Sequence, residues 1–152
     1  MKLAEALIKR SDLQKYVKQY KHRLAKCATV QEGLDPVEDP QKLVAKAEQA
    51  IAELERLVCR ISRTNALTVF ADGLTLADAV VRRDMLMVRH LLHFDLAEAA
   101  TVSESRYSQR EIRTVPAIDV LATRRAGDNL AREFRELDTK IQALNWTVDL
   151  VE

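Results

Sequence analysis

The chain has 152 residues, enough for one ordinary domain that buries a core without a metal or a disulfide. Only three Gly and three Pro, with 47% hydrophobic and 31% charged residues, argue against a turn-rich β fold and against disorder. The 24 Lys and Arg residues nearly balance the 23 Asp and Glu residues, so no global field favours nucleic acid or an anionic membrane. We therefore expect a single helical-bundle domain over residues 1–152.

The first predicted element is an amphipathic helix near residues 2–28. Its inward positions step by three and then four residues, which is the period of one helix face. One charged residue, Arg10, lies in the middle of this otherwise apolar row. The row comprises Leu3, Ala6, Leu7, Arg10, Leu13, Val17, Tyr20, Leu24 and Cys27.

A second helix is predicted near 40–65, after a linker that contains Gly33 and Pro36. Asp39 suits the N-cap and Pro40 the first helical position, so the helix begins there. Its apolar row is Leu43, Ala47, Ala50, Leu54, Leu57 and Ile61, flanked on one side by Val44, Ile51 and Val58. Residues 66–74 favour a tight turn or small hairpin, because Val69 and Phe70 prefer strand and Asp72-Gly73 is a turn pair.

The third helix, near 75–100, begins at an N-cap Thr75 with Asp78 three positions later. It differs from the others in carrying two adjacent apolar rows, which together cover about half of its circumference at 100° per residue. One row is Leu76, Val80, Met87, Leu91 and Phe94, and the other is Val81, Met85, Val88 and Leu92. We expect the second row to form a subunit interface, with deeper burial inside one bundle as the alternative.

The longest connection spans 101–117 and leads to a fourth helix near 118–145. Gly127 lies on the buried row of that helix, where it permits close helix approach. Four long helices joined in this order predict an all-α, up-down-up-down antiparallel bundle.

The charged residues Arg10 and Asp84 each lie about nine positions after the start of a predicted helix. The first and third helices run the same way in such a bundle, so both side chains fall at one level of the core. Because an unpaired buried charge is costly, we expect the two to form a buried polar layer that fixes register or oligomeric state. A catalytic or ligand-binding role for the pair is the alternative.

The long connection gathers arginines around one tyrosine, and these residues are a candidate anion-binding site: Arg106, Tyr107, Arg110 and Arg113. Glu104 and Glu111 can equally neutralise them within the connection. If the protein is an enzyme, this end of the bundle is where its site is expected.

No motif indicates a metal, a cofactor or a catalytic group. His90 and His93 fall on the polar side of the third helix and are interpreted as surface histidines. Cys27 and Cys59 lie near opposite ends of antiparallel helices, too far apart for a disulfide. Free thiols favour a reducing cytoplasm. No stretch approaches the 18 apolar residues that would indicate a membrane span.

Several segments resemble a small bacterial all-helical family of unknown function that often carries the name septicolysin. The resemblance rests on Met1–Leu7 with Arg10 and Asp12-Leu13-Gln14, then Arg63-Thr64-Asn65, Arg83-Asp84, Arg106-Tyr107-Ser108 with Glu111-Ile112, and Leu137-Asp138 through Leu144-Asn145-Trp146. The chain departs from the pattern at Arg82, where an acidic residue is expected. The resemblance implies a bacterial, helical, oligomeric protein, and the family name implies a haemolysin-like activity.

From these observations we expect a non-enzymatic cytoplasmic bundle that self-associates as an even-numbered symmetric homo-oligomer and binds an anionic ligand or partner at its loop end. A membrane-active protein and an enzyme with a site near Arg106–Arg113 are the alternatives. No nucleic acid, cofactor or metal is expected.

Overall fold

The computed structural model describes residues 1–71, 73–101 and 115–152, which form two compact units. The first unit comprises Met1–Val69 with Ala143–Glu152, and the second comprises Phe70–Gln142. The described residues contain four long helices and one two-stranded sheet, so the predicted all-α class is confirmed. The expectation of a single bundle domain over 1–152 stays a prediction.

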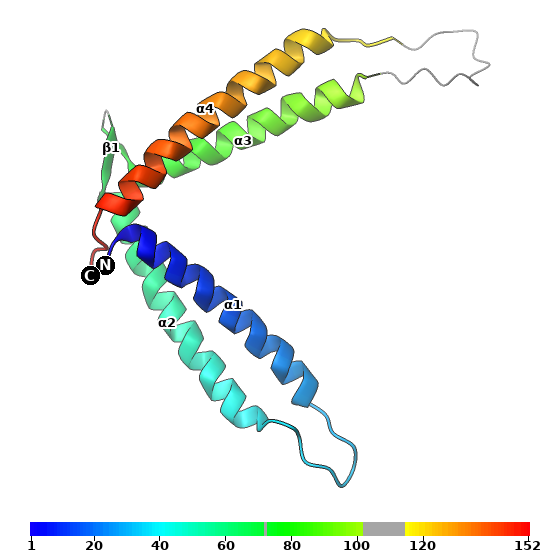
Figure 1. Ribbon diagram of the computed structural model, residues 1–152, viewed down its shortest axis with the longest axis vertical. Helices are drawn as coiled ribbons and strands as arrows, with labels where there is room; N and C mark the ends of the chain where they lie inside the picture. The colour runs from blue at the N-terminus through cyan, green and yellow to red at the C-terminus, as the bar shows by residue number, and fades with distance from the viewer. Residues whose placement is uncertain (72, 102–114) are drawn as a thin grey trace, which may run out of the picture. The chain divides into compact units, whose positions relative to one another are not determined.

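The first unit is built on an antiparallel pair of helices, α1 (Leu3–Cys27) and α2 (Pro40–Leu67), which run side by side (Figure 1). Their shared core follows the predicted 3-4 spacing. Its buried members are Leu3, Ala4, Ala6, Leu13 and Cys27 from α1, and Leu43, Leu57, Ile61 and Thr64 from α2. As predicted, Asp39 is the N-cap of α2: its carboxylate accepts from the backbone N–H of Gln41 at 2.9 Å, and Pro40 opens the helix.

The two ends of the chain meet in the first unit, which the sequence did not predict. The backbone N–H of Leu3 donates to the Val148 carbonyl, and the N–H of Leu150 donates to the Met1 carbonyl, both at 2.9 Å. Lys2 and Asp149 form an isolated antiparallel bridge, and their side chains form an ion pair at 2.9 Å. The C-terminal segment is thereby held against the start of α1.

The second unit begins at Phe70, within the short hairpin of β1 (Val69–Ala71) and β2 (Leu74–Thr75). Gly73 of this hairpin lies in the left-handed region at φ 80°. This confirms the small hairpin predicted over 66–74. Helix α3 (Leu76–Ala99) follows at once, and Thr75 and Asp78 form the predicted capping box. Helix α4 (Val120–Thr147) starts after Asp119, whose carboxylate accepts from the N–H of Ala122 at 2.9 Å.

Helices α3 and α4 run antiparallel and side by side (Figure 1). Three contacts define their register: Arg83 with Asp138, His90 with Gly127, and Glu98 with Arg124. All three contacts are polar, whereas the core of the α1–α2 pair is mainly apolar. The interface between α3 and α4 is thus partly polar, and the candidate site is described from the two sides of α3.

Candidate functional site

The side of α3 that faces α4 is a polar seam. It steps by three and four residues through Ala79, Arg83, Leu86, His90, His93 and Ala97. Ala79, Leu86 and Ala97 are buried, and the three polar residues between them are partly buried. The row predicted to face inward, which contains Met87, Leu91 and Phe94, lies beside this seam, and Leu91 and Phe94 are about half exposed.

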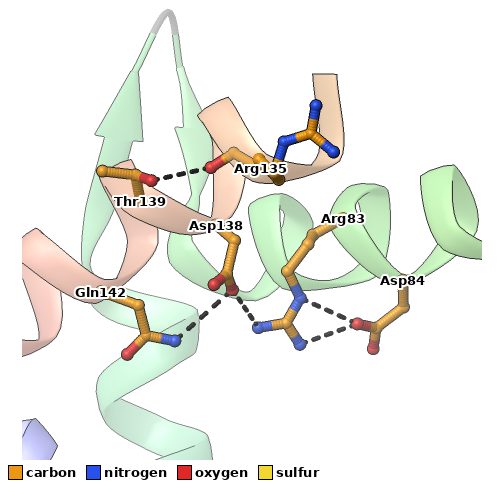
Figure 2. A network of polar contacts seen from close by, with 6 residues as sticks. All are labelled: Arg83, Asp84, Arg135, Asp138, Thr139 and Gln142. Atoms are coloured by element: carbon orange, nitrogen blue, oxygen red, sulfur yellow. Dashed lines mark hydrogen bonds and ion pairs between the residues drawn. The ribbon is translucent and has the colours of Figure 1, made fainter. Parts of the chain in front are cut away.

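Arg83 is the centre of the polar network in this seam. Figure 2 shows its guanidinium between the carboxylates of Asp84 and Asp138. Its Nη1 donates to Asp138 Oδ1 at 3.0 Å, while its Nη2 and Nε donate to Asp84 Oδ1 at 2.7 and 3.0 Å. Burial alone would lower the pKa of Arg83, but its hydrogen bonds to the two carboxylates outweigh burial and raise the pKa. Arg83 is therefore a fixed positive charge that ties α3 to α4.

The two histidines of α3 lie in the same seam, so their interpretation as surface residues is wrong. The His90 Nδ1 is 2.9 Å from the Gly127 carbonyl oxygen. The His93 Nδ1 is buried and has no hydrogen-bond partner among the described residues. The prediction rested on hydrophobicity, with apolar residues expected on the inner face. Here the inner face instead holds side chains that fit against the glycine of α4.

The opposite side of α3 carries four large apolar residues that α4 does not cover. These are the members of the second predicted row, and they are exposed to 60% (Val81), 47% (Met85), 57% (Val88) and 66% (Leu92). At 100° per residue their mean direction lies about 150° around the helix from the polar seam. We call these four residues the α3 stripe. Their 4-3-4 spacing is that of a row that packs against another helix.

Asp84, which was expected in a buried layer with Arg10, has a side chain that is 54% exposed and is paired with the adjacent Arg83. The partner of Asp84 is thus its neighbour in sequence and not a residue of another helix. Arg10 is partly buried on the inward row of α1, and its Nε is buried without a hydrogen-bond partner among the described residues. Because Arg10 and Asp84 belong to different units, their pairing stays a prediction.

The predicted anion-binding residues Arg106, Tyr107, Arg110 and Arg113 lie outside the described residues. Among the described residues, a small cavity of about 200 Å³ lies between α3 and α4. Its lining includes His90, Glu98 and Arg124. The Arg124 guanidinium donates to the Glu98 carboxylate at 3.0 Å and to the Thr101 hydroxyl at 3.3 Å, so its charge is already partnered.

The described residues contain no group of three or more His, Cys, Asp or Glu side chains placed to hold a metal ion. Within the same ranges, no helix is both long enough and apolar enough to cross a membrane. Cys27 is buried and Cys59 is exposed, and both are free thiols. Among the described residues, the α3 stripe is an apolar row whose members are 47–66% exposed, and it is the candidate interaction site.

Comparisons with known proteins agree with this picture of the fold. A model of the family of unknown function DUF6847 matches residues 10–150. A crystal structure described as a functionally unknown conserved protein from Corynebacterium diphtheriae is similar, with 40% sequence identity and a TM-score of 0.94 over 99% of each chain. None of the curated proteins matches the chain. The expected resemblance is thus found at the level of a family of unknown function, and the name septicolysin does not accompany it.

Proposed function

The chain belongs to the family of unknown function DUF6847, and we propose that it is a non-enzymatic helical protein that self-associates through the α3 stripe. The observation that carries this proposal is the exposure of Val81, Met85, Val88 and Leu92, between 47% and 66%, on a helix whose opposite face is already packed.

The exposed apolar surface of these side chains gives an energetic reason for self-association. Fully burying a Val, Leu or Met side chain contributes about 1.5–3 kcal/mol, so covering the exposed part of each contributes on the order of 1 kcal/mol. A contiguous apolar surface rimmed by charged residues is typical of an interaction site on a soluble protein. Because most homo-oligomers are symmetric, we expect the stripe to pack against the same stripe of a second copy.

Sedimentation velocity over a range of micromolar concentrations tests the proposal. We expect the unchanged protein to form a dimer or a higher even-numbered assembly. Introducing two lysines into the stripe, Met85→Lys with Leu92→Lys, should produce monomers because each lysine would have to be desolvated in the interface. The matched control is Leu121→Lys, which alters an α4 leucine that is 61% exposed and lies outside the stripe.

Circular dichroism should show equal helicity in all three proteins, since every changed position is exposed. A monomeric unchanged protein, or an assembly that survives both lysines, would contradict the proposal. The cytoplasmic location, the anionic ligand and the enzymatic alternative near Arg106–Arg113 stay predictions, because they rest on cysteine chemistry and on residues outside the described ranges.

A further inference from the structure

The two edges of the α3 stripe carry opposite charges. Arg82 and Arg89, seven residues apart, each directly follow a valine of the stripe and lie along one edge. Asp84 directly precedes Met85 and lies along the other edge. All three residues are exposed. In paired helices these edge positions decide which relative direction is favoured, because they face the edges of the partner helix.

The edges discriminate between the two ways in which a pair of α3 helices can meet. In a parallel pair, Asp84 of one copy faces Arg89 of the other, five positions further along, and symmetry repeats this contact. In an antiparallel pair, like edges meet, which places Arg82 of one copy beside Arg89 of the other. The parallel pair therefore gains two attractive contacts, whereas the antiparallel pair gains two repulsive ones.

Among the residues that the structure describes, no contact occupies either charge fully. Arg83 binds only the Oδ1 oxygen of Asp84, and Oδ2 has no hydrogen-bond partner among the described residues. Arg89 likewise forms no ion pair within the described ranges. Because α4 packs on the far side of α3, it does not obstruct a second helix at the stripe.

We infer that two copies of the chain pair their α3 helices in parallel, with Asp84 of each copy facing Arg89 of the other. This inference rests on the proposed self-association and adds the direction of pairing and the residues that select it. Val81 then faces Val81 of the second copy, and Leu92 faces Leu92, along a two-fold axis parallel to the helices.

Charge reversal at Arg89 gives opposite results for the two directions. In the parallel pair, Arg89→Glu places two carboxylates side by side at each contact and should weaken the dimer roughly tenfold. Adding Asp84→Lys should return the dissociation constant to within about threefold of the unchanged protein. In an antiparallel pair, Arg89→Glu would face Arg82 and tighten the dimer. Arg125→Glu, at an exposed position on α4, is the control and should change little.

Cysteine cross-linking tests the same inference without relying on charge. The background carries Cys59→Ser, which removes the exposed thiol, and keeps the buried Cys27. Val81→Cys alone should form an intermolecular disulfide on oxidation, because a parallel pair brings the two positions within the roughly 7 Å between Cα atoms that a disulfide requires. Antiparallel pairing would instead cross-link a mixture of Val81→Cys and Leu92→Cys chains.

The outcomes separate this inference from the proposed function. Suppose that the two stripe lysines abolish the dimer, but Arg89→Glu tightens it or cross-links form only in the mixture. Self-association through the stripe then stands, and the parallel pairing is overturned. A dimer that forms neither cross-link also overturns it, because another segment would then cover the stripe. A monomer at all concentrations overturns both.

Discussion

The imidazole Nδ1 of His90 lies 2.9 Å from the carbonyl oxygen of Gly127, and this contact fixes how closely α3 and α4 approach. A Cβ atom added at residue 127 would lie 3.4 Å from the Cβ of His93 and 3.7 Å from the His90 Nδ1. Gly127 is buried inside α4, where glycine weakens a helix more than any other residue except proline. The two histidines therefore pack against a position at which the helix itself is weak.

Replacing Gly127 separates helix propensity from packing. The nearest contacts of an added methyl group are ordinary ones, so Gly127→Ala should stabilise the protein by about 0.5–1 kcal/mol through helix propensity. Gly127→Leu should destabilise it by about 1–3 kcal/mol, because the larger side chain must displace the histidines. Urea unfolding measures both changes. Loss of stability in Gly127→Ala would mean that the two helices tolerate no added atom there.

A second prediction concerns Thr64, whose side chain is fully buried in the first unit. Its hydroxyl donates to the Arg60 carbonyl at 2.8 Å and accepts from the backbone N–H of Val151 at 3.0 Å. Thr64→Val preserves the shape but removes the acceptor, and should cost about 1–2 kcal/mol of unfolding free energy.

The matched control for this change is Thr139→Val on α4. Thr139 is exposed and its hydroxyl makes the same kind of bond to the carbonyl four residues earlier, at 2.8 Å. We expect this control to change stability by less than about 0.5 kcal/mol. Equal effects at the two positions would show that the contact with Val151 contributes nothing to stability.

Arg10 and Asp84 offer a test of the predicted buried pair. If they were partners in a core, changing one alone would cost about 3–5 kcal/mol. Because Asp84 is half exposed and bound by Arg83, we expect Arg10→Met and Asp84→Leu to be additive within about 0.5 kcal/mol in a double-mutant cycle. A coupling energy above about 1 kcal/mol would establish that the two side chains meet.

The capping box of α3 makes stability depend on pH. The Thr75 hydroxyl and backbone N–H donate to the Asp78 carboxylate and lower its pKa below the ordinary value. A lowered pKa in the folded state favours folding above the unfolded pKa of about 3.9, and this contribution is lost as the pH falls through the folded value. Asp78→Asn should therefore lower the melting temperature at pH 7, and the difference from the unchanged protein should shrink as the pH falls below the unfolded pKa of Asp78.

The control for the pH experiment is Asp95→Asn in the last part of the same helix. A carboxylate near a helix C-terminus interacts unfavourably with the helix dipole, so this change should not lower the melting temperature at pH 7. Equal pH profiles for Asp78→Asn and the unchanged protein would contradict the capping argument.

Much of the fold could be predicted because its determinants are local. The 3-4 spacing located all four helices, and the Asp39-Pro40 and Thr75–Asp78 signals located two of their starts. The contact of Lys2 with Asp149 could not be found this way, because it depends on where the two chain ends meet. Nothing in either segment alone indicates its partner.

The candidate site could be predicted only in part, because spacing shows which residues share a helix face but not which face packs against another helix. Spacing identified the four residues of the α3 stripe as a row of their own, and all four are exposed. Their role as a subunit interface stays a prediction. The seam with Arg83 and His90 was missed because hydrophobicity was taken as the measure of burial. The same 3-4 count, started from Leu76 and Ala79, passes through both residues and would have indicated an inward polar row.

The pairing of the chain ends also bears on the order in which the protein folds. Lys2 Nζ bonds the carbonyl of Thr147, 145 positions away, and the N–H of Leu3 bonds the Val148 carbonyl. During synthesis from the N-terminus, α1 and α2 can associate as soon as both have left the ribosome. The start of α1 must wait for nearly the whole chain before its own contacts form. Completing the first unit is therefore a late step, because the start of α1 waits for the segment that follows α4.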